Sequence, residues 1–97
     1  MSKGPIVATA ENVTRQVLSH HPELMVVAFC FEREGSNDAL HDHPHARSTY
    51  VESGRYRFTL GEEEHELGPG DRLTIPPGTT RGCVCLEPGT FIDCFTP

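Results

Sequence analysis

The chain has 97 residues, with 14 acidic and 8 basic side chains and a formal net charge of −6. This length predicts a single domain over residues 1–97, and the acidic balance argues against a nucleic-acid partner, which needs a basic surface. No apolar run approaches the roughly 20 residues of a membrane-spanning helix, so we expect no membrane partner. The N-terminal segment has one lysine and no sustained apolar stretch, so we expect no signal peptide and a cytoplasmic, reducing location.

The N-terminal part of the chain has an ambiguous pattern. We expect residues 1–22 to form an N-terminal strand or arm and residues 24–97 to form a barrel. Within the arm, Thr9 or Asn12 suits the start of a helix. The β-branched residues of the segment 7–19 suit a strand equally well, so helix and strand both remain open there.

The rest of the chain consists of short apolar or alternating segments between turns rich in glycine and proline. The predicted strands are 24–31, 55–60, 63–67, 72–75, 83–86 and 91–95. Gly61-Glu62 suits a hairpin turn between two of them, and the segment 68–71 is a dense turn signal. Many short strands at this spacing predict an all-β sandwich or barrel.

A histidine-rich segment is the strongest functional signal. His41 and His43 are two residues apart, so in a strand both side chains lie on one face. Two imidazoles placed in this way can converge on a divalent metal ion. His45 has the same parity beyond Pro44 and is the candidate third ligand.

Residues at several fixed offsets resemble the two motifs of the cupin superfamily. The first motif is matched by Gly35, His41, His43 and Gly54, and the second by Gly70, Pro76 and Gly78. The resemblance covers about residues 24–97. It implies a cupin double-stranded β-helix, an RmlC-like jelly-roll barrel with the site inside it. It also implies a homodimer, since small cupins often pair with a second copy.

Within the superfamily, two segments are similar to small single-domain cupins of the pectin-degradation type. These segments are the histidine run 41–45 and the C-terminal stretch 91–97. Cupins of that type act on unsaturated uronate monosaccharides, so the resemblance implies a small sugar acid as the ligand.

The chain departs from the metal-binding cupin pattern at two ligand positions. Those cupins add a Glu or Gln shortly after the two histidines and a His that closes the second motif. Here the first position falls in Ala46, Arg47 and Ser48, and the second is Arg81. A guanidinium has no lone pair to donate, and it repels a cation by about 4 kcal/mol at 4 Å with an effective dielectric of about 20.

A metal such as Zn, Ni, Mn or Fe would therefore need another ligand, and the sequence offers several. His45 is the first, and His65 lies on a predicted strand with inward parity. A thiolate of Cys83 or Cys85 is the remaining possibility. All four cysteines, Cys30 and Cys94 included, lie in apolar strand-like contexts that are typical of buried free thiols, and their spacing is not the C-x-x-C of zinc or redox sites.

Three classes of function follow, and they leave open whether the protein is an enzyme. In the first, a metal-free pocket binds or transforms a small carboxylate-bearing metabolite such as a sugar acid. Arg81 and Arg47 would bond to the carboxylate, with His45 and Tyr56 also in the ligand-binding set.

The second class is a metal-dependent isomerase, lyase or dioxygenase with the metal on His41, His43 and His45. The third is a non-catalytic regulatory or structural cupin. A plainer interpretation of Arg81 is that it lies at the rim and pairs with Asp71 or Glu87.

Overall fold

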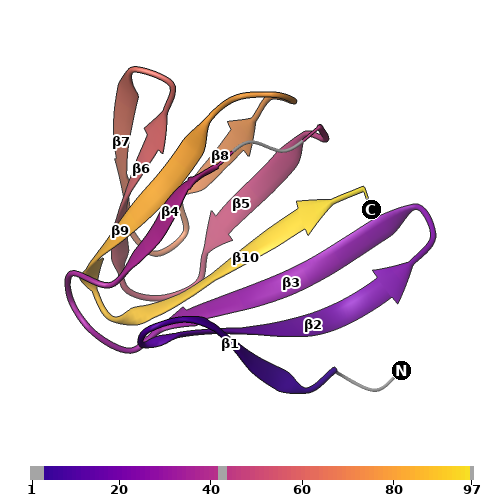
Figure 1. Ribbon diagram of the computed structural model, residues 1–97, viewed down its shortest axis with the longest axis horizontal. Coiled ribbons are helices and arrows are strands. Elements are labelled where there is room, and N and C mark those ends of the chain that lie inside the picture. Colours follow the sequence, from indigo (N-terminus) through magenta and orange to yellow (C-terminus); the bar gives the residue numbers. More distant parts are fainter. Residues whose placement is uncertain (1–3, 42–43, 97) are drawn as a thin grey trace.

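The computed structural model describes residues 4–41 and 44–96, and it describes the side chains of these residues except those of residues 38–41. Within this part of the chain there are ten strands and no helix (Figure 1). The strands are β1 (Ile6–Ala10), β2 (Val13–His21), β3 (Leu24–Phe31), β4 (Asn37–His41), β5 (Arg47–Val51), β6 (Arg55–Leu60), β7 (Glu63–Leu67), β8 (Arg72–Ile75), β9 (Arg81–Glu87) and β10 (Gly89–Phe95). Within these residues there is accordingly no helix that could cross a bilayer.

The strands form two antiparallel sheets that face one another. The larger sheet has the order β1-β2-β3-β10-β5-β8 and the smaller one has the order β4-β9-β6-β7. Figure 1 shows the two layers enclosing an interior between β9 and β10. The predicted all-β jelly-roll barrel is therefore confirmed.

The ambiguous N-terminal segment forms a hairpin of β1 and β2 rather than a helix. Its turn is tight because Asn12 adopts a φ of 61°, a left-handed conformation that asparagine tolerates better than most residues. At the start of β2, Val13 is buried beside its partner Phe31 of β3, whereas Arg15, farther along the strand, is exposed. The hairpin predicted at Gly61-Glu62 joins β6 to β7, as expected.

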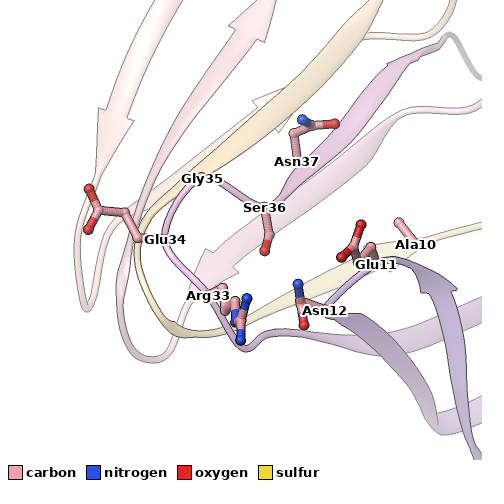
Figure 2. A pocket seen from close by; sticks show the side chains of 8 residues that line it. All are labelled: Ala10, Glu11, Asn12, Arg33, Glu34, Gly35, Ser36 and Asn37. Carbon is pink, nitrogen blue, oxygen red and sulfur yellow. The ribbon is translucent and has the colours of Figure 1, made fainter.

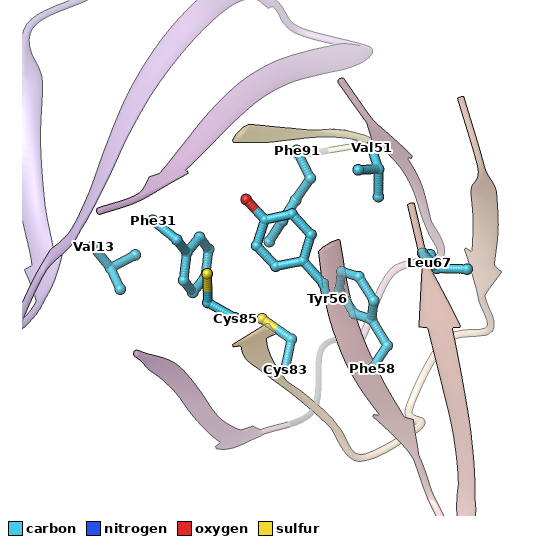
Figure 3. Packing of buried hydrophobic residues seen from close by; sticks show 9 residues of the cluster. All are labelled: Val13, Phe31, Val51, Tyr56, Phe58, Leu67, Cys83, Cys85 and Phe91. Atoms are coloured by element: carbon cyan, nitrogen blue, oxygen red, sulfur yellow. The ribbon is translucent and has the colours of Figure 1, made fainter. Parts of the chain in front are cut away.

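One end of the interior is filled by the aromatic cluster, which we define as Phe31, Tyr56, Phe58 and Phe91 (Figure 3). The Phe91 ring centroid lies 5.4, 5.1 and 5.3 Å from those of Phe31, Tyr56 and Phe58, with edge-to-face or tilted contacts. These side chains come from both sheets, so their burial joins the two layers. We call this the aromatic end of the barrel.

Two glycines allow turns to meet closely at the aromatic end. Gly54 has a φ of 79°, and a Cβ there would lie 2.5 Å from the Glu87 carbonyl oxygen. A Cβ on Gly89 would overlap the Ser53 carbonyl oxygen. The glycine that closes the first cupin-like motif is thus required by backbone conformation and by the neighbouring turn.

Candidate ligand site

Four side chains form a polar cluster at the opposite end of the interior, which we call the arginine end. The arginine cluster consists of Arg47, Thr49, Arg81 and Asp93. Thr49 and Asp93 face each other on paired strands β5 and β10, while Arg81 begins β9 in the other sheet. Inward alternation of strands from both sheets therefore brings these residues together across the barrel.

Asp93 is the centre of the arginine cluster. Its Oδ1 accepts a 2.5 Å hydrogen bond from the Thr49 hydroxyl. Its Oδ2 lies 3.2 Å from Nη1 of Arg47 and 3.4 Å from Nη2 of Arg81. Asp93 and Thr49 are fully buried and Arg81 is 2 % exposed. Buried charges are costly unless they are paired and hydrogen-bonded, and this cluster meets that condition for Asp93.

Arg47 lies nearest to solvent in the arginine cluster. Its side chain is 11 % exposed, and its guanidinium carbon lies 4.1 Å from the centre of the Phe95 ring. Phe95 follows Asp93 by two residues on the same face of β10. One strand therefore supplies both a carboxylate for the edge of this guanidinium and an aromatic face for its plane.

The structure brings together Arg47 and Arg81 among the predicted ligand-binding residues, but it places Tyr56 elsewhere. Tyr56 lies opposite Cys85 in the β6–β9 register, four residues from Leu60, which is opposite Arg81. That offset is roughly 13 Å along the strand. Tyr56 belongs to the aromatic cluster and is fully buried there.

The Tyr56 hydroxyl is a buried polar group in an apolar setting. No hydrogen-bond partner reaches it among the described residues. Burial raises its pKa well above the usual 10.0, with a smaller contribution from Cys85. Tyr56 is therefore a neutral phenol over the whole physiological pH range.

The predicted histidines have different placements. His45 is exposed in the bend before β5. The backbone of His41 pairs with that of Arg81 at the arginine end, but its side chain lies outside the described part of the structure. His43 also lies outside the described residues. His65, the other proposed third ligand, is 40 % exposed and lies 3.5 Å from Glu63.

The described residues do not fit a divalent metal. No three His, Cys, Asp or Glu side chains among them gather in a way that could hold one. The only carboxylate of the arginine cluster is bonded to two guanidiniums and a hydroxyl, and Arg81 has no lone pair to donate. A site that includes the side chains of His41 and His43 lies outside the described part of the structure.

The plainer interpretation of Arg81 is wrong, because Arg81 is buried and pairs with Asp93. Asp71 instead accepts a 2.8 Å bond from the backbone N–H of Gly68 in its own turn. Sequence reasoning did not identify Asp93 or Thr49. A signal was present, since Asp93 is a single acid at an inward position between Phe91 and Phe95.

The cysteines are all free thiols. Cys83 and Cys85 are buried on the inner face of β9, whereas Cys30 and Cys94 are half-buried. Burial raises the pKa of Cys85, with smaller contributions from Glu34 and Cys30. The interpretation of Cys83 and Cys85 as small core residues agrees with this placement.

A polar cavity of about 450 Å³ lies away from the arginine cluster (Figure 2). It lies between the β1–β2 turn and the β3–β4 loop, next to the aromatic end. Its lining residues are Ala10, Glu11, Asn12, Arg33, Glu34, Gly35, Ser36 and Asn37. Most of these residues are exposed, and the charged ones have both signs, with Arg33 beside Glu11 and Glu34.

The two-sheet barrel with a polar cluster inside one end defines a cupin-type protein, and sequence comparison agrees. The cupin domain model matches residues 28–94. An RmlC-like cupin from Shewanella frigidimarina NCIMB 400 is 31 % identical, with a TM-score of 0.89 over 97 % of this chain and 84 % of that one. The chain therefore belongs to the cupin family.

Two further comparisons extend this relationship. KdgF from Halomonas sp. is 33 % identical, with a TM-score of 0.89 over 96 % of this chain and 87 % of that one. The polyketide cyclase RemF from Streptomyces resistomycificus is 21 % identical, with a TM-score of 0.80 over 92 % and 68 %, and shares the fold alone. Among curated proteins, none matches the chain.

Proposed function

We propose that this cupin binds a small carboxylate-bearing metabolite, such as a sugar acid, at the arginine end of its barrel, without a metal. The observation that carries the proposal is the pair of guanidiniums, Arg47 and Arg81, on one buried carboxylate. Guanidinium groups bind carboxylates through two parallel N–H bonds, which gives both affinity and orientation.

The family relationship supports the choice of a sugar acid. KdgF from Halomonas sp. is similar over nearly all of both chains. The sequence resemblance to cupins of the pectin-degradation type implies an unsaturated uronate. The substitution of Arg81 for the metal-binding histidine supports a site in which a fixed organic cation takes the place of a metal ion.

The exposure of the two arginines suggests how a ligand would enter. Arg47 retains 11 % of its side-chain surface and Arg81 retains 2 %. A carboxylate that arrives from solvent would therefore meet Arg47 first, while Arg81 lies behind it. We expect Arg47 to make the direct contact and Arg81 to supply charge from within the barrel.

Calorimetry and metal analysis together test the proposal. Protein purified without a metal-affinity column should contain less than about one tenth of an equivalent of metal, and should bind D-galacturonate or its unsaturated derivative with unchanged affinity in EDTA. Arg47→Met should weaken binding at least tenfold, which corresponds to the loss of a charged hydrogen bond.

Two results would contradict the proposal. Stoichiometric metal that disappears in a His41→Ala/His43→Ala variant would favour the metal-dependent enzyme. Failure to bind any uronate would favour a regulatory or structural role.

We also propose that two copies of the chain pair in the cytoplasm. Every residue of β1 is exposed, and Ile6 is 68 % exposed although it is apolar. An exposed apolar strand at a sheet edge is a favourable surface for association. Light scattering of the purified protein should give the mass of a dimer, and a monomer at all concentrations would contradict the pairing.

A further inference from the structure

A single carboxylate connects both arginines of the proposed site. Asp93 uses Oδ1 for Thr49 and Oδ2 for Arg47 and Arg81. The Thr49 bond fixes the plane of the carboxylate, because it comes from a fully buried hydroxyl on the adjacent strand. The guanidiniums then meet a carboxylate that has little freedom to move.

The two guanidiniums would repel each other without Asp93. They come from opposite sheets and point toward the same oxygen atom, so like charges are held close together in a poorly solvated interior. A shared carboxylate between them cancels that repulsion. Removal of its charge should therefore allow both guanidiniums to move apart.

Arg47 is held in two directions by β10. Asp93 bonds to the edge of its guanidinium, and the Phe95 ring covers its face at 4.1 Å. A planar cation that is held at one edge and one face has a defined orientation before any ligand arrives. Such preorganisation increases affinity because less freedom is lost on binding.

We propose that Asp93, held by Thr49, is the positioning residue of the anion site and keeps Arg47 and Arg81 together as one binding unit. This inference rests on the proposed binding of a carboxylate at the arginine end. Asp93 itself does not contact the ligand. It acts through the two arginines, and its own negative charge would oppose an anionic ligand.

Because of this opposition, the proposal and an effect of net charge alone predict opposite changes in affinity when the charge of Asp93 is removed. If only the net charge mattered, Asp93→Asn would strengthen binding of an anion, because it removes a negative charge from the interior. If Asp93 positions the arginines, the same substitution weakens binding. The exposed residue Glu66 provides the matched control, because Glu66→Gln makes the same change of charge outside the cluster.

The first experiment is calorimetric titration with D-galacturonate of the parent, D93N, T49V and E66Q, each shown to be folded by circular dichroism. We expect D93N to weaken binding at least tenfold, T49V to weaken it at least threefold, and E66Q to change it less than twofold. T49V keeps every charge, so it tests positioning even if D93N does not fold. Binding by D93N that equals or exceeds that of E66Q would overturn the proposal, as would parental affinity in T49V.

The second experiment needs no ligand. The side-chain guanidinium signals of Arg47 and Arg81 in ¹⁵N-resolved NMR spectra report hindered rotation about the Nε–Cζ bond. We expect hindered rotation of both in the parent, faster rotation of both in D93N, and an intermediate effect in T49V.

A change in only one guanidinium, or in neither, would show that Asp93 does not hold the pair. If both respond while the parent binds no uronate, the proposed function fails and the positioning of the arginines stands.

Discussion

Arg81 and Asp93 form an ion pair that crosses the barrel, with 3.4 Å between Nη2 and Oδ2 and almost no exposure of either side chain. Arg81 belongs to the smaller sheet and Asp93 to the larger one. The pair therefore joins the two layers at the arginine end, as the aromatic cluster does at the other end. Because the pair joins the two layers, the loss of either Arg81 or Asp93 should lower the stability of the barrel strongly.

Asp93→Ala should destabilise the protein by about 3–5 kcal/mol, because it removes the buried carboxylate that Arg47 and Arg81 share. Glu66→Ala is the matched control. The Arg55–Glu66 pair has an N–O distance of 3.2 Å, equal to that of Arg47–Asp93, but its side chains are 42 % and 51 % exposed. Its loss should cost less than about 1 kcal/mol. Urea unfolding measures the loss of stability in both variants. Similar losses would contradict the expectation that the buried ion pairs of Asp93 stabilise the protein more than the exposed Arg55–Glu66 pair does.

The hydrophobic alternation of the sequence predicted most of the strands, because the direction of a side chain, inward or outward, follows from its position along its own strand. Tyr56, Phe58 and Leu60 alternate along one strand, and the structure buries all three. The partner of Arg81 could not be found in this way. Asp93 is on the other sheet, and a local pattern does not determine which strands of two sheets lie opposite each other.

Stability should fall as the pH rises above about 9. A raised pKa in the folded state means that the unfolded chain releases its proton first, so deprotonation favours unfolding. Cys85 should contribute above its usual pKa of 9.0 and Tyr56 above its usual 10.0. Each group can contribute a slope of up to about 1.4 kcal/mol per pH unit.

Chemical unfolding at pH 8, 9, 10 and 11 measures this dependence. Tyr56→Phe removes the phenol but keeps the ring, so it should abolish the additional loss above pH 10 and leave that of Cys85. An unchanged pH dependence in this variant would mean that Tyr56 ionises equally in both states.

Gly89→Ala should destabilise the protein by more than about 2 kcal/mol, because its Cβ would overlap the Ser53 carbonyl oxygen. Gly61→Ala is the control, since Gly61 has a φ of 58° but no atom within 4 Å of a Cβ. The control should lose only about 1 kcal/mol from backbone strain. Thermal unfolding of both variants tests the difference, and equal losses would show that the two turns separate easily.

Cys30 and Cys94 should react with a thiol reagent before Cys83 and Cys85. The first two are half-buried on the outer face of the larger sheet, and the other two are buried inside the barrel. A C30S/C94S variant should therefore show almost no reaction until denaturant is added. Rapid reaction of the remaining thiols in that variant would indicate frequent opening of the β9 region.

The aromatic cluster also limits the length of any molecule that enters from the arginine end. Phe91 precedes Asp93 by two residues on the same face of β10, so its ring lies about 7 Å deeper along the strand. The space beyond Asp93 is closed by rings that pack within 5.4 Å of one another. Asp93 and Thr49 are themselves fully buried, so a ligand that binds at Arg47 does not extend past Asp93, and a longer saccharide would have to leave its remaining units in solvent.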